Sequence, residues 1–429
     1  MTPISPPSPP PSPRRILLAS MVGTAIEFYD FYIYATAAAL VFATLFFPKG
    51  NPSLAQFASF ATFGVAFFAR PIGGIVFGHF GDRIGRKSTL VTSLLLMGGS
   101  TFLIAFLPSY VLWGWWAPAC LCLLRFGQGF GLGGEWGGAA LLAIENAPRG
   151  WEARYGTAPQ QGAPVGYFIA NGFFLLIATQ MGSADFIAWG WRIPFLGSAA
   201  MVAIGLWIRL KLTETPAFAA ALADAAPPLV PLGTVLKHHW RAAILGSIAS
   251  VACFMVFYIM TVTSLNYGVN TLHYSRSAFL GVQVAAIPLM AVGVHFAGWL
   301  ADTRLNPARV LGLGTVLTIV AGALLPVMMV RDSVLTVWLF LAFTAFVMGL
   351  VYGPLGAFLP SLFPVAVRYS GVSFSFNLAA ILGGALTPIV AGWLVEKGGL
   401  PYVGAYLAGA GVVSLIALLA HPSPARAAR

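Results

Sequence analysis

The sequence predicts an all-α membrane protein with twelve transmembrane helices in two pseudo-symmetric bundles of six. Of its 429 residues, 59% are hydrophobic and 8% are charged, and the mean hydropathy is +0.85. Soluble domains carry about 25% charged residues, so a soluble enzyme, a secreted module and a disordered chain are excluded. The apolar runs are continuous and do not alternate, which favours helices over a membrane β-barrel.

Twelve apolar runs are long enough to cross a bilayer, for which a helix needs about 20 residues. They group into an N-terminal bundle over 16–212 and a C-terminal bundle over 239–420. The other segments are expected to be a disordered tail over 1–15, a linker over 213–238 and a second tail over 421–429. The expected spans are 16–46, 55–80, 88–107, 116–146, 156–182, 192–212, 239–268, 276–301, 309–330, 334–364, 369–396 and 402–420.

The net charge of +11 is best explained by membrane topology and not by nucleic-acid binding. Lysine and arginine concentrate in cytoplasmic loops. Sixteen of them fall in loops on the N-terminal side of the expected membrane and five in the opposite loops, so both termini are expected in the cytoplasm. The cysteines Cys120, Cys122 and Cys253 lie in apolar runs and have no disulfide or metal-site spacing, and we expect no metal and no cofactor.

Two motifs recur in equivalent places of the two halves, which indicates internal duplication. The run from Gly78 to Asp82 follows the second span, and a similar run from Gly298 to Asp302 follows the eighth, 220 residues later. Likewise, ENAP at 145–148 is followed by Arg-Tyr at 154–155, and SLFP at 361–364 by Arg-Tyr at 368–369.

The segment GHFGDRIGRK (78–87) resembles the loop signature between helices two and three of the major facilitator superfamily. The segments EFYDFYIY, FFARPIGG, RFGQGFGLGGEWGGA, WGWRIP, ETPAF and FPVAVRYSG resemble its metabolite:proton symporter family, which includes bacterial permeases for 2-oxoglutarate, citrate, shikimate and proline/betaine. The resemblance runs from about residue 16 to residue 420 and implies a central cavity with alternating access. It does not specify the cargo, because these motifs are shared by members with different cargo.

The sequence departs from the family pattern in its second half. Thr303, Asn306 and Pro307 stand where the first loop copy has Arg83, Arg86 and Lys87, and Ser361 replaces a carboxylate common in related proteins. We therefore expect fewer charged gate contacts from the C-terminal half.

Ionisable residues at membrane depth are costly and are candidates for function. Five lie in the first half: Glu27, Asp30, Arg70, Arg125 and Glu135. Because the second half has almost none, proton coupling is expected in the N-terminal bundle, on Glu27, Asp30 or Glu135. How firmly a carboxyl group in such a dry site holds its proton depends on its burial and on the charges near it.

Arg125 is the main candidate for holding a cargo carboxylate, since a guanidinium offers a planar, bidentate fork. The alternative is that it forms a buried ion pair that only orients helices. The other candidates for cargo contact are neutral polar side chains, which would serve equally well as interhelical hydrogen bonds: Gln128, Gln160, Tyr167, Asn171, Tyr258 and Asn377.

A gate is expected at the cytoplasmic side, by resemblance. Asp82 is expected at the N-terminus of a neighbouring helix, where the helix dipole favours an anion, and Arg86 is expected to pair with Glu145. The remaining gate candidates are Arg83, Arg154 and Asp302.

Together these features predict a proton-coupled symporter for a small polar metabolite, with an organic acid such as a di- or tricarboxylate favoured. The alternative is a proline/betaine symporter, whose site would need a carboxylate and an aromatic face. A transporter-like nutrient sensor is a remote alternative. The chain is expected to be a monomer in the inner (plasma) membrane, with no enzymatic activity and no nucleic-acid partner.

Overall fold

The computed structural model describes residues 13–48, 50–84, 86–133, 135–211 and 231–420. Within these ranges, the side chains of a few residues are not described. They are those of residues 13–16, 19, 78–84, 86–90, 135, 142, 208–211, 231 and 366. The tail predicted over 421–429, most of the tail predicted over 1–15 and most of the linker predicted over 213–238 lie outside the described residues. Residues 13–15 correct the prediction of a disordered tail over 1–15, because they begin the helix Pro13–Ala37.

The described part of the first half is helical throughout, apart from short connections, and corresponds to the first six predicted spans. Several spans consist of two or three consecutive helix segments. The elements are α1 (Pro13–Ala37), η1 (Ala38–Phe42), α2 (Ala43–Phe46), α3 (Pro52–Ile84), α4 (Arg86–Ile104), α5 (Tyr110–Trp113), α6 (Trp116–Gly131), α7 (Glu135–Glu145), α8 (Glu152–Gln160), α9 (Gly162–Gln180), α10 (Ser183–Asp185), η2 (Phe186–Gly190) and α11 (Arg192–Lys211).

The second half repeats this arrangement and begins with a short helix inside the predicted linker. The elements are α13 (Pro231–His238), α14 (Trp240–Tyr258), η3 (Ile259–Thr263), α15 (Ser264–Asn270), α16 (Arg276–Ala286), α17 (Pro288–Thr303), α18 (Pro307–Met328), α19 (Val334–Tyr352), α20 (Leu355–Ser361), η4 (Val365–Val367), α21 (Arg368–Ala380), η5 (Ile381–Ala385), α22 (Leu386–Gly398) and α23 (Leu400–Ala420).

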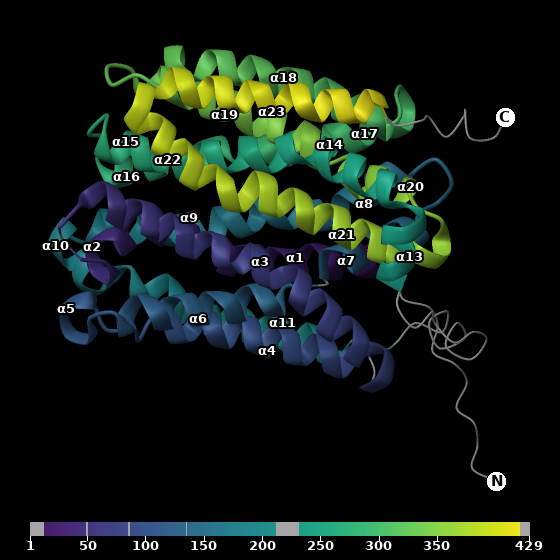
Figure 1. The fold of residues 1–429 in the computed structure, drawn as a ribbon, viewed down its shortest axis with the longest axis horizontal. Helices are drawn as coiled ribbons and strands as arrows, with labels where there is room; N and C mark the ends of the chain where they lie inside the picture. The colour runs from purple at the N-terminus through teal and green to yellow at the C-terminus, as the bar shows by residue number, and fades with distance from the viewer. Residues whose placement is uncertain (1–12, 49, 85, 134, 212–230, 421–429) are drawn as a thin grey trace, which may run out of the picture.

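The helices run side by side along the long axis of the molecule (Figure 1). α3, α4, α6 and α11 pack together in the first half, and α14, α18, α19 and α23 pack together in the second. Where the halves meet, α8 and α9 contact α17 and α16, and α7 contacts α21. The interface between the halves is therefore built from a few helices of each.

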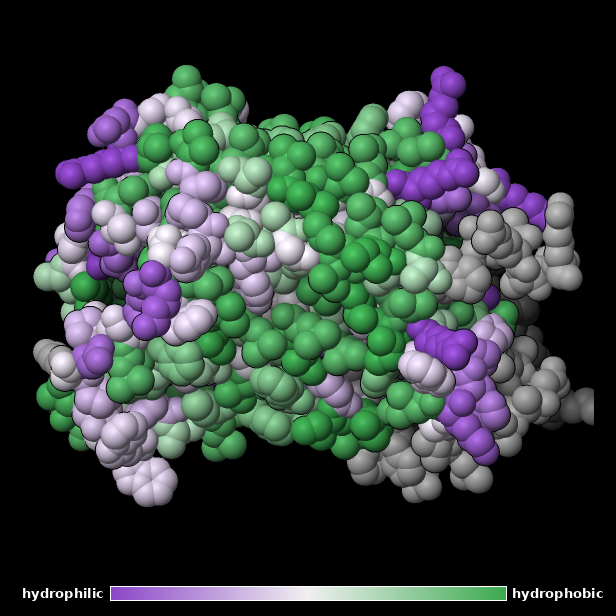
Figure 2. Space-filling model, turned by 45° about the horizontal axis from the view of Figure 1, so that its top comes forward, coloured by the Kyte–Doolittle hydropathy of each residue, from purple (hydrophilic) through white to green (hydrophobic). Residues whose placement is uncertain are grey.

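The outer surface is suited to a bilayer. Hydrophobic residues cover the middle of the visible face, and hydrophilic residues gather at the two ends of the molecule (Figure 2). In the described ranges, nine helices are long and apolar enough to cross a membrane, and a tenth is formed by the bent pair Ser183–Gly190 and Arg192–Trp207. The third predicted span corresponds to α4, whose fully described apolar part is Val91–Ile104, and the fourth is divided between α6 and α7.

The interruption of the fourth span is a correction to the sequence prediction of one continuous helix over 116–146. α6 ends at Gly131 and α7 begins at Glu135. Glycine-rich backbone ends helices readily, because glycine has the greatest conformational freedom to lose. Glu135, which a continuous helix would place on the same face as Arg125 and Gln128, therefore begins a separate helix.

Proline explains several of the other breaks, because it cannot donate a hydrogen bond inside a helix. α16 and α17 meet at Pro288, and α19 and α20 meet at Pro354. Spans one, seven and eleven instead contain a five-residue π-helical turn, namely η1, η3 and η5. Turns of this kind widen a helix locally and are frequent at functional sites.

Glycine allows α3 and α6 to pack at very short range. A Cβ added to Gly73 would overlap the carbonyl oxygen of Phe130, and one added to Gly129 would overlap the backbone of Ala66. This close packing brings the polar residues of α3 and α6 near α1.

Candidate functional site

A narrow cavity lies between the two bundles. α1 contributes Glu27 and Phe28 to its wall, α3 contributes Arg70, and α21 contributes Asn377. Its volume is about 30 Å³, far below the roughly 300 Å³ or more of a typical ligand pocket. The bundles are therefore nearly closed around a set of side chains that includes one acid and one base.

Two aromatic rings close one side of this cavity. Trp136 of α7 and Phe376 of α21 stack face to face, with ring centroids 3.6 Å apart and planes inclined by 7°. The indole nitrogen of Trp136 donates a hydrogen bond to Oε1 of Gln160 at 3.1 Å, and Nε2 of Gln160 donates to the carbonyl oxygen of Tyr352 at 3.4 Å. The predicted cargo residue Gln160 thus connects the two bundles behind the stack and does not line the cavity.

Arg70 reaches the cavity over aromatic rings. Its guanidinium carbon lies 4.6 Å from the centroid of the Phe31 ring and 5.2 Å from that of the Phe67 ring. The negative face of an aromatic ring attracts a cation, most strongly where water is excluded. Glu27 acts electrostatically on the same guanidinium. These contacts hold a positive charge at the cavity wall.

A second polar cluster lies inside the N-terminal bundle. Asp30 is 1% exposed, and its Oδ2 accepts a hydrogen bond from the hydroxyl of Thr101 at 3.0 Å. Nε2 of Gln128 donates to that hydroxyl oxygen at 2.7 Å, and Nη1 of Arg125 donates to Oε1 of Gln128 at 3.0 Å. A continuous chain of hydrogen bonds therefore joins Arg125 to Asp30 across α6, α4 and α1.

Arg125 is completely buried and is surrounded by aromatic rings. Its guanidinium carbon lies 4.0 Å from the Tyr34 ring centroid, 4.2 Å from that of Phe31 and 4.9 Å from that of Phe63. Its Nε and Nη2 atoms have no hydrogen-bond partner among the described residues, and neither has Oδ1 of Asp30. The structure thus puts Arg125 with Asp30 inside the bundle, whereas Arg70 is the arginine at the cavity.

The remaining neutral candidates do not line this cavity. The hydroxyl of Tyr167 donates to Oε1 of Gln283, across the interface, at 3.2 Å. Oδ1 of Asn171 accepts a hydrogen bond from Thr36 at 2.6 Å within the N-terminal bundle. Tyr258 contacts the Phe63 ring, with centroids 5.3 Å apart.

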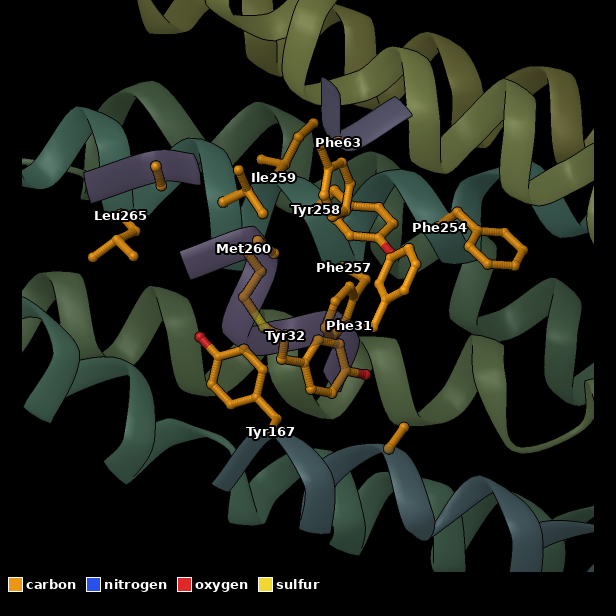
Figure 3. Close-up of a cluster of buried hydrophobic side chains, with 14 of the residues drawn as sticks. Phe31, Tyr32, Phe63, Tyr167, Phe254, Phe257, Tyr258, Ile259, Met260 and Leu265 are labelled. Atoms are coloured by element: carbon orange, nitrogen blue, oxygen red, sulfur yellow. The ribbon is translucent and has the colours of Figure 1, made fainter. Parts of the chain in front are cut away.

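The aromatic side chains of both halves meet in one cluster at this interface. Figure 3 shows Tyr32, Phe63 and Tyr167 of the N-terminal bundle together with Phe257 and Tyr258 of the C-terminal bundle. Tyr32 lies 5.2 Å from both Tyr167 and Phe257, measured between ring centroids. Tyr167 and Tyr258 therefore take part in closing the two bundles against each other.

Asp302 forms a polar contact between the bundles, at an end of the interface that we call the latch end. Its carboxylate oxygens accept hydrogen bonds from the backbone N–H groups of Ala153 and Arg154, at 2.9 and 3.0 Å. Its Oδ2 also lies 3.4 Å from Nε of Arg154. These N–H groups belong to the first turn of α8, where the helix dipole favours an anion. Asp302 of α17 thus caps a helix of the other bundle.

The other gate candidates are only partly covered by the structure. Asp82 and Arg83 lie at the end of α3 and Arg86 at the start of α4, and their side chains are outside the described residues. The side chain of Glu135, at the start of α7, is likewise outside them. Glu145 ends α7 and is exposed. The predicted pairing of Arg86 with Glu145 stays a prediction.

The structure also shows site residues that the sequence reasoning missed. These are the aromatic residues Phe31, Trp136 and Phe376, and the polar residues Thr101 and Gln283. In a chain with 14% aromatic residues, composition does not distinguish a ring at a site from a ring facing lipid. Gln283 is different, because an uncharged amide in the middle of an apolar span is itself a signal of a buried partner.

Comparison with known proteins gives a consistent result. The family model described as "Sugar (and other) transporter" matches residues 16–225. The chain is 48% identical over 412 residues to the inner membrane metabolite transport protein YhjE of Escherichia coli (strain K12), covering 95% of this chain and 94% of that protein. It is 36% identical over 420 residues to the shikimate transporter of the same bacterium, covering 96% and 95%.

A more distant relative is the proline/betaine transporter of Salmonella typhimurium (strain LT2), 33% identical over 397 residues, with 90% and 78% covered. Among solved structures, a crystal structure of the D-xylose–proton symporter has a TM-score of 0.72 at 18% identity, covering 95% of this chain and 96% of that one. This likeness shows the same fold.

The identities, which extend over nearly the whole chain, together with the all-helical fold establish the family. The chain therefore belongs to the metabolite:proton symporter family of the major facilitator superfamily, and is a membrane transporter with the twelve-helix fold of that superfamily, not an enzyme.

Proposed function

We propose that this transporter carries a small carboxylate-bearing metabolite together with a proton across the inner membrane. The observation that carries this proposal is the separation of two charged sites in the N-terminal bundle. Arg70 and Glu27 face the cavity between the bundles, and Asp30 lies sealed beside Arg125. A symporter needs one site for cargo and another for the coupling ion.

Arg70 is the residue proposed to bind the cargo carboxylate, because its guanidinium presents several donors to the cavity. Asn377, from the other bundle, adds an amide that can donate to or accept from a cargo hydroxyl. A cargo held by both side chains would draw the bundles together around it. This is the step that alternating access requires.

Asp30 is the residue proposed to carry the proton. It is 1% exposed, and only one of its oxygens has a hydrogen-bond partner in the described part of the chain. A buried carboxylate is stabilised by nearby positive charge, and Arg125 supplies that charge. Movement of Arg125 during transport would change how firmly Asp30 holds its proton.

The relatives support a carboxylate cargo. Shikimate, proline and betaine, the compounds in the printed names of two of these transporters, all carry one carboxylate. Since the described residues that line the cavity include one arginine, we favour a cargo with one carboxylate over a di- or tricarboxylate. We further propose that the latch end faces the cytoplasm, as do both termini, and that the protein acts as a monomer.

The aromatic walls of the cavity favour a second candidate, a betaine-like zwitterion. Glu27 lies in the same wall as Phe28, Trp136 and Phe376. A carboxylate together with aromatic faces is suited to a quaternary ammonium group. In this case Arg70 would hold the cargo carboxylate, and Glu27 with the rings would hold the cation.

The two candidates are separated by a binding screen. Purified protein is titrated with shikimate, succinate, citrate, L-proline and glycine betaine, and its melting temperature is recorded. Stabilisation by shikimate that is lost in Arg70→Gln and kept in Glu27→Gln supports the organic acid. Stabilisation by glycine betaine that is lost in both variants supports the zwitterion. Stabilisation by none of the monocarboxylates would contradict the proposed cargo class.

A further inference from the structure

Phe31 is the aromatic residue over which both Arg70 and Arg125 lie. The guanidinium carbon of Arg70 is 4.6 Å from its ring centroid, and that of Arg125 is 4.2 Å away. The two carbons therefore lie within about 9 Å of each other, where charges in a dry interior interact appreciably. Phe31 is 1% exposed and follows Asp30 directly in α1.

Each of the neighbouring rings Phe63 and Phe67 lies near the guanidinium group of one arginine. Phe67 lies 5.2 Å from the guanidinium carbon of Arg70, and Phe63 lies 4.9 Å from that of Arg125. Phe31 packs against both rings, with centroid distances of 5.3 Å to Phe63 and 5.1 Å to Phe67. Among the described residues, Phe31 is thus the shared contact between Arg70, at the cavity, and Arg125, inside the N-terminal bundle.

Electrostatic interactions also link Arg70, Arg125 and Asp30 in that order. Arg125 lies within electrostatic range of both Arg70 and Asp30. The like charges of Arg70 and Arg125 repel each other. The negatively polarised face of the Phe31 ring attracts both guanidinium groups and offsets part of this repulsion. If a cargo carboxylate neutralises Arg70, the repulsion falls and Arg125 can move relative to Asp30.

We propose that Phe31 is a positioning residue that couples the cargo site to the proton site, by holding Arg70 and Arg125 over one ring. This inference rests on the proposed function, since it takes Arg70 as the cargo arginine and Asp30 as the proton carrier. Cargo binding at Arg70 changes the position of Arg125 through Phe31, and the change alters the proton affinity of Asp30. Loss of the ring leaves both sites in place but weakens the link between them.

Other titratable groups surround this set. From α1 these are Glu27, Tyr29 and Tyr34, and from the C-terminal bundle Tyr258 and Tyr352. Phenols ordinarily ionise near pH 10, above the range of the experiment. Glu27 is a second carboxyl group in this set, so the measurement must be specific for Asp30.

The experiment follows Asp30 by infrared spectroscopy, through the carbonyl band of its protonated carboxyl group. The band is assigned by its disappearance in Asp30→Asn, which separates it from Glu27. Arg70→Gln removes the cavity charge, as a bound carboxylate would, and requires no knowledge of the cargo. In the wild-type background, this substitution is expected to raise the pH at which Asp30 takes up its proton by about half a unit, a threefold change in proton affinity.

The informative comparison repeats Arg70→Gln in two further backgrounds. In Phe31→Leu the shift caused by Arg70→Gln should fall below one third of its wild-type size, because the shared ring is gone. Phe67→Leu is the matched control, because the Phe67 ring lies near the guanidinium of Arg70 but not near that of Arg125 among the described contacts. In this background the shift should be retained. If Phe31→Leu does not fold, a trifluorinated phenylalanine at position 31 keeps the shape of the ring and removes its negative face.

Two results would overturn the inference. One is a shift of equal size in the wild type and in the Phe31 variants, which would mean that the charges interact through space without the ring. The other is the absence of any shift in the wild-type background. In either case, proton-driven uptake by the wild type would leave the proposed function intact, so the two failures are distinguishable.

Discussion

Arg70 and Arg125 illustrate, at the scale of single residues, how the same side chain serves different roles in different surroundings. Arg70 lines the cavity between the bundles, and Arg125 is sealed among the rings of Phe31, Tyr34 and Phe63. The first can meet a cargo, whereas the second is enclosed by side chains of the protein. The division of labour between cargo and proton follows from this difference.

Lysine substitutions at the two positions should therefore behave differently. Arg70→Lys keeps the charge but loses the planar fork, so it should weaken binding of a carboxylate cargo by about tenfold or more. Arg125→Lys should leave cargo affinity within about twofold and change the pH dependence of uptake. Titration calorimetry with the probe identified in the binding screen measures the affinities. Equal loss of affinity in both variants would contradict the division.

The sequence predicted which residues are unusual, but not which way each one faces. Ionisable residues at membrane depth stand out by cost alone, and all five candidates were found that way. Helical periodicity tells which residues share a face, yet it does not tell which face meets the other bundle. For this reason Arg70 received no role in the cargo site from sequence, and Arg125 was expected there.

Asp302 shows a residue whose position at the latch end was predicted from the repeat. Asp302→Asn keeps the size of the side chain but removes the charge that caps α8 and faces Arg154. The loss of about 1 kcal/mol should shift the equilibrium between open and closed forms of the latch end about fivefold toward the open form. To measure this equilibrium, a single cysteine is placed in the latch end of an otherwise cysteine-free protein. The fraction of molecules whose cysteine reacts with a thiol reagent reports how much of the protein is open at this end.

Thr303→Ala is the matched control for that experiment. Thr303 is adjacent and exposed, and its hydroxyl donates only within its own helix, to the carbonyl oxygen of Trp299. The control should leave the accessibility unchanged. Unchanged accessibility in Asp302→Asn as well would show that the capping contact does not hold the latch end closed.

At the scale of the elements, glycine determines how closely α3 and α6 approach. Gly73→Ala would drive a methyl group into the backbone of Phe130, and neither helix can move without disturbing Arg70 and Arg125. We expect a loss of about 3 kcal/mol or more in stability and a lower melting temperature. Gly99→Ala in α4 is the control, since its added Cβ would meet nothing within 4 Å. A tolerated Gly73→Ala would contradict the tight packing.

The helices themselves could be located from apolar runs, but their interruptions could not. The gap between α6 and α7, and the π-helical turns η1, η3 and η5, depend on tertiary packing. In η3, for example, Nε2 of Gln283 donates to the carbonyl oxygens of Met260 and Thr261 at 3.0 and 2.8 Å. Gln283 belongs to another span, so the local sequence around η3 does not predict the π-helical turn.

At the scale of the whole molecule, composition, internal repetition and the resemblance to a known family together predicted the fold. Low charge content requires a membrane environment, and the recurrence of Asp82 and Asp302 in equivalent loops indicates two similar halves. Both bundles contribute to every closing contact described between them. These contacts are Asp302 with α8, Trp136 with Phe376, and Tyr167 with Gln283. Opening toward either side must break one set and can preserve the other.

The central claim is that cargo movement is coupled to proton movement through Asp30. The most direct measurement reconstitutes the protein in liposomes that contain a pH-sensitive dye and adds shikimate or glycine betaine outside, with no pH gradient. The account predicts that the lumen acidifies as cargo enters, and that Asp30→Asn abolishes acidification while still exchanging labelled cargo for unlabelled cargo. Cargo uptake without acidification in the wild type, or undiminished acidification in Asp30→Asn, would contradict it.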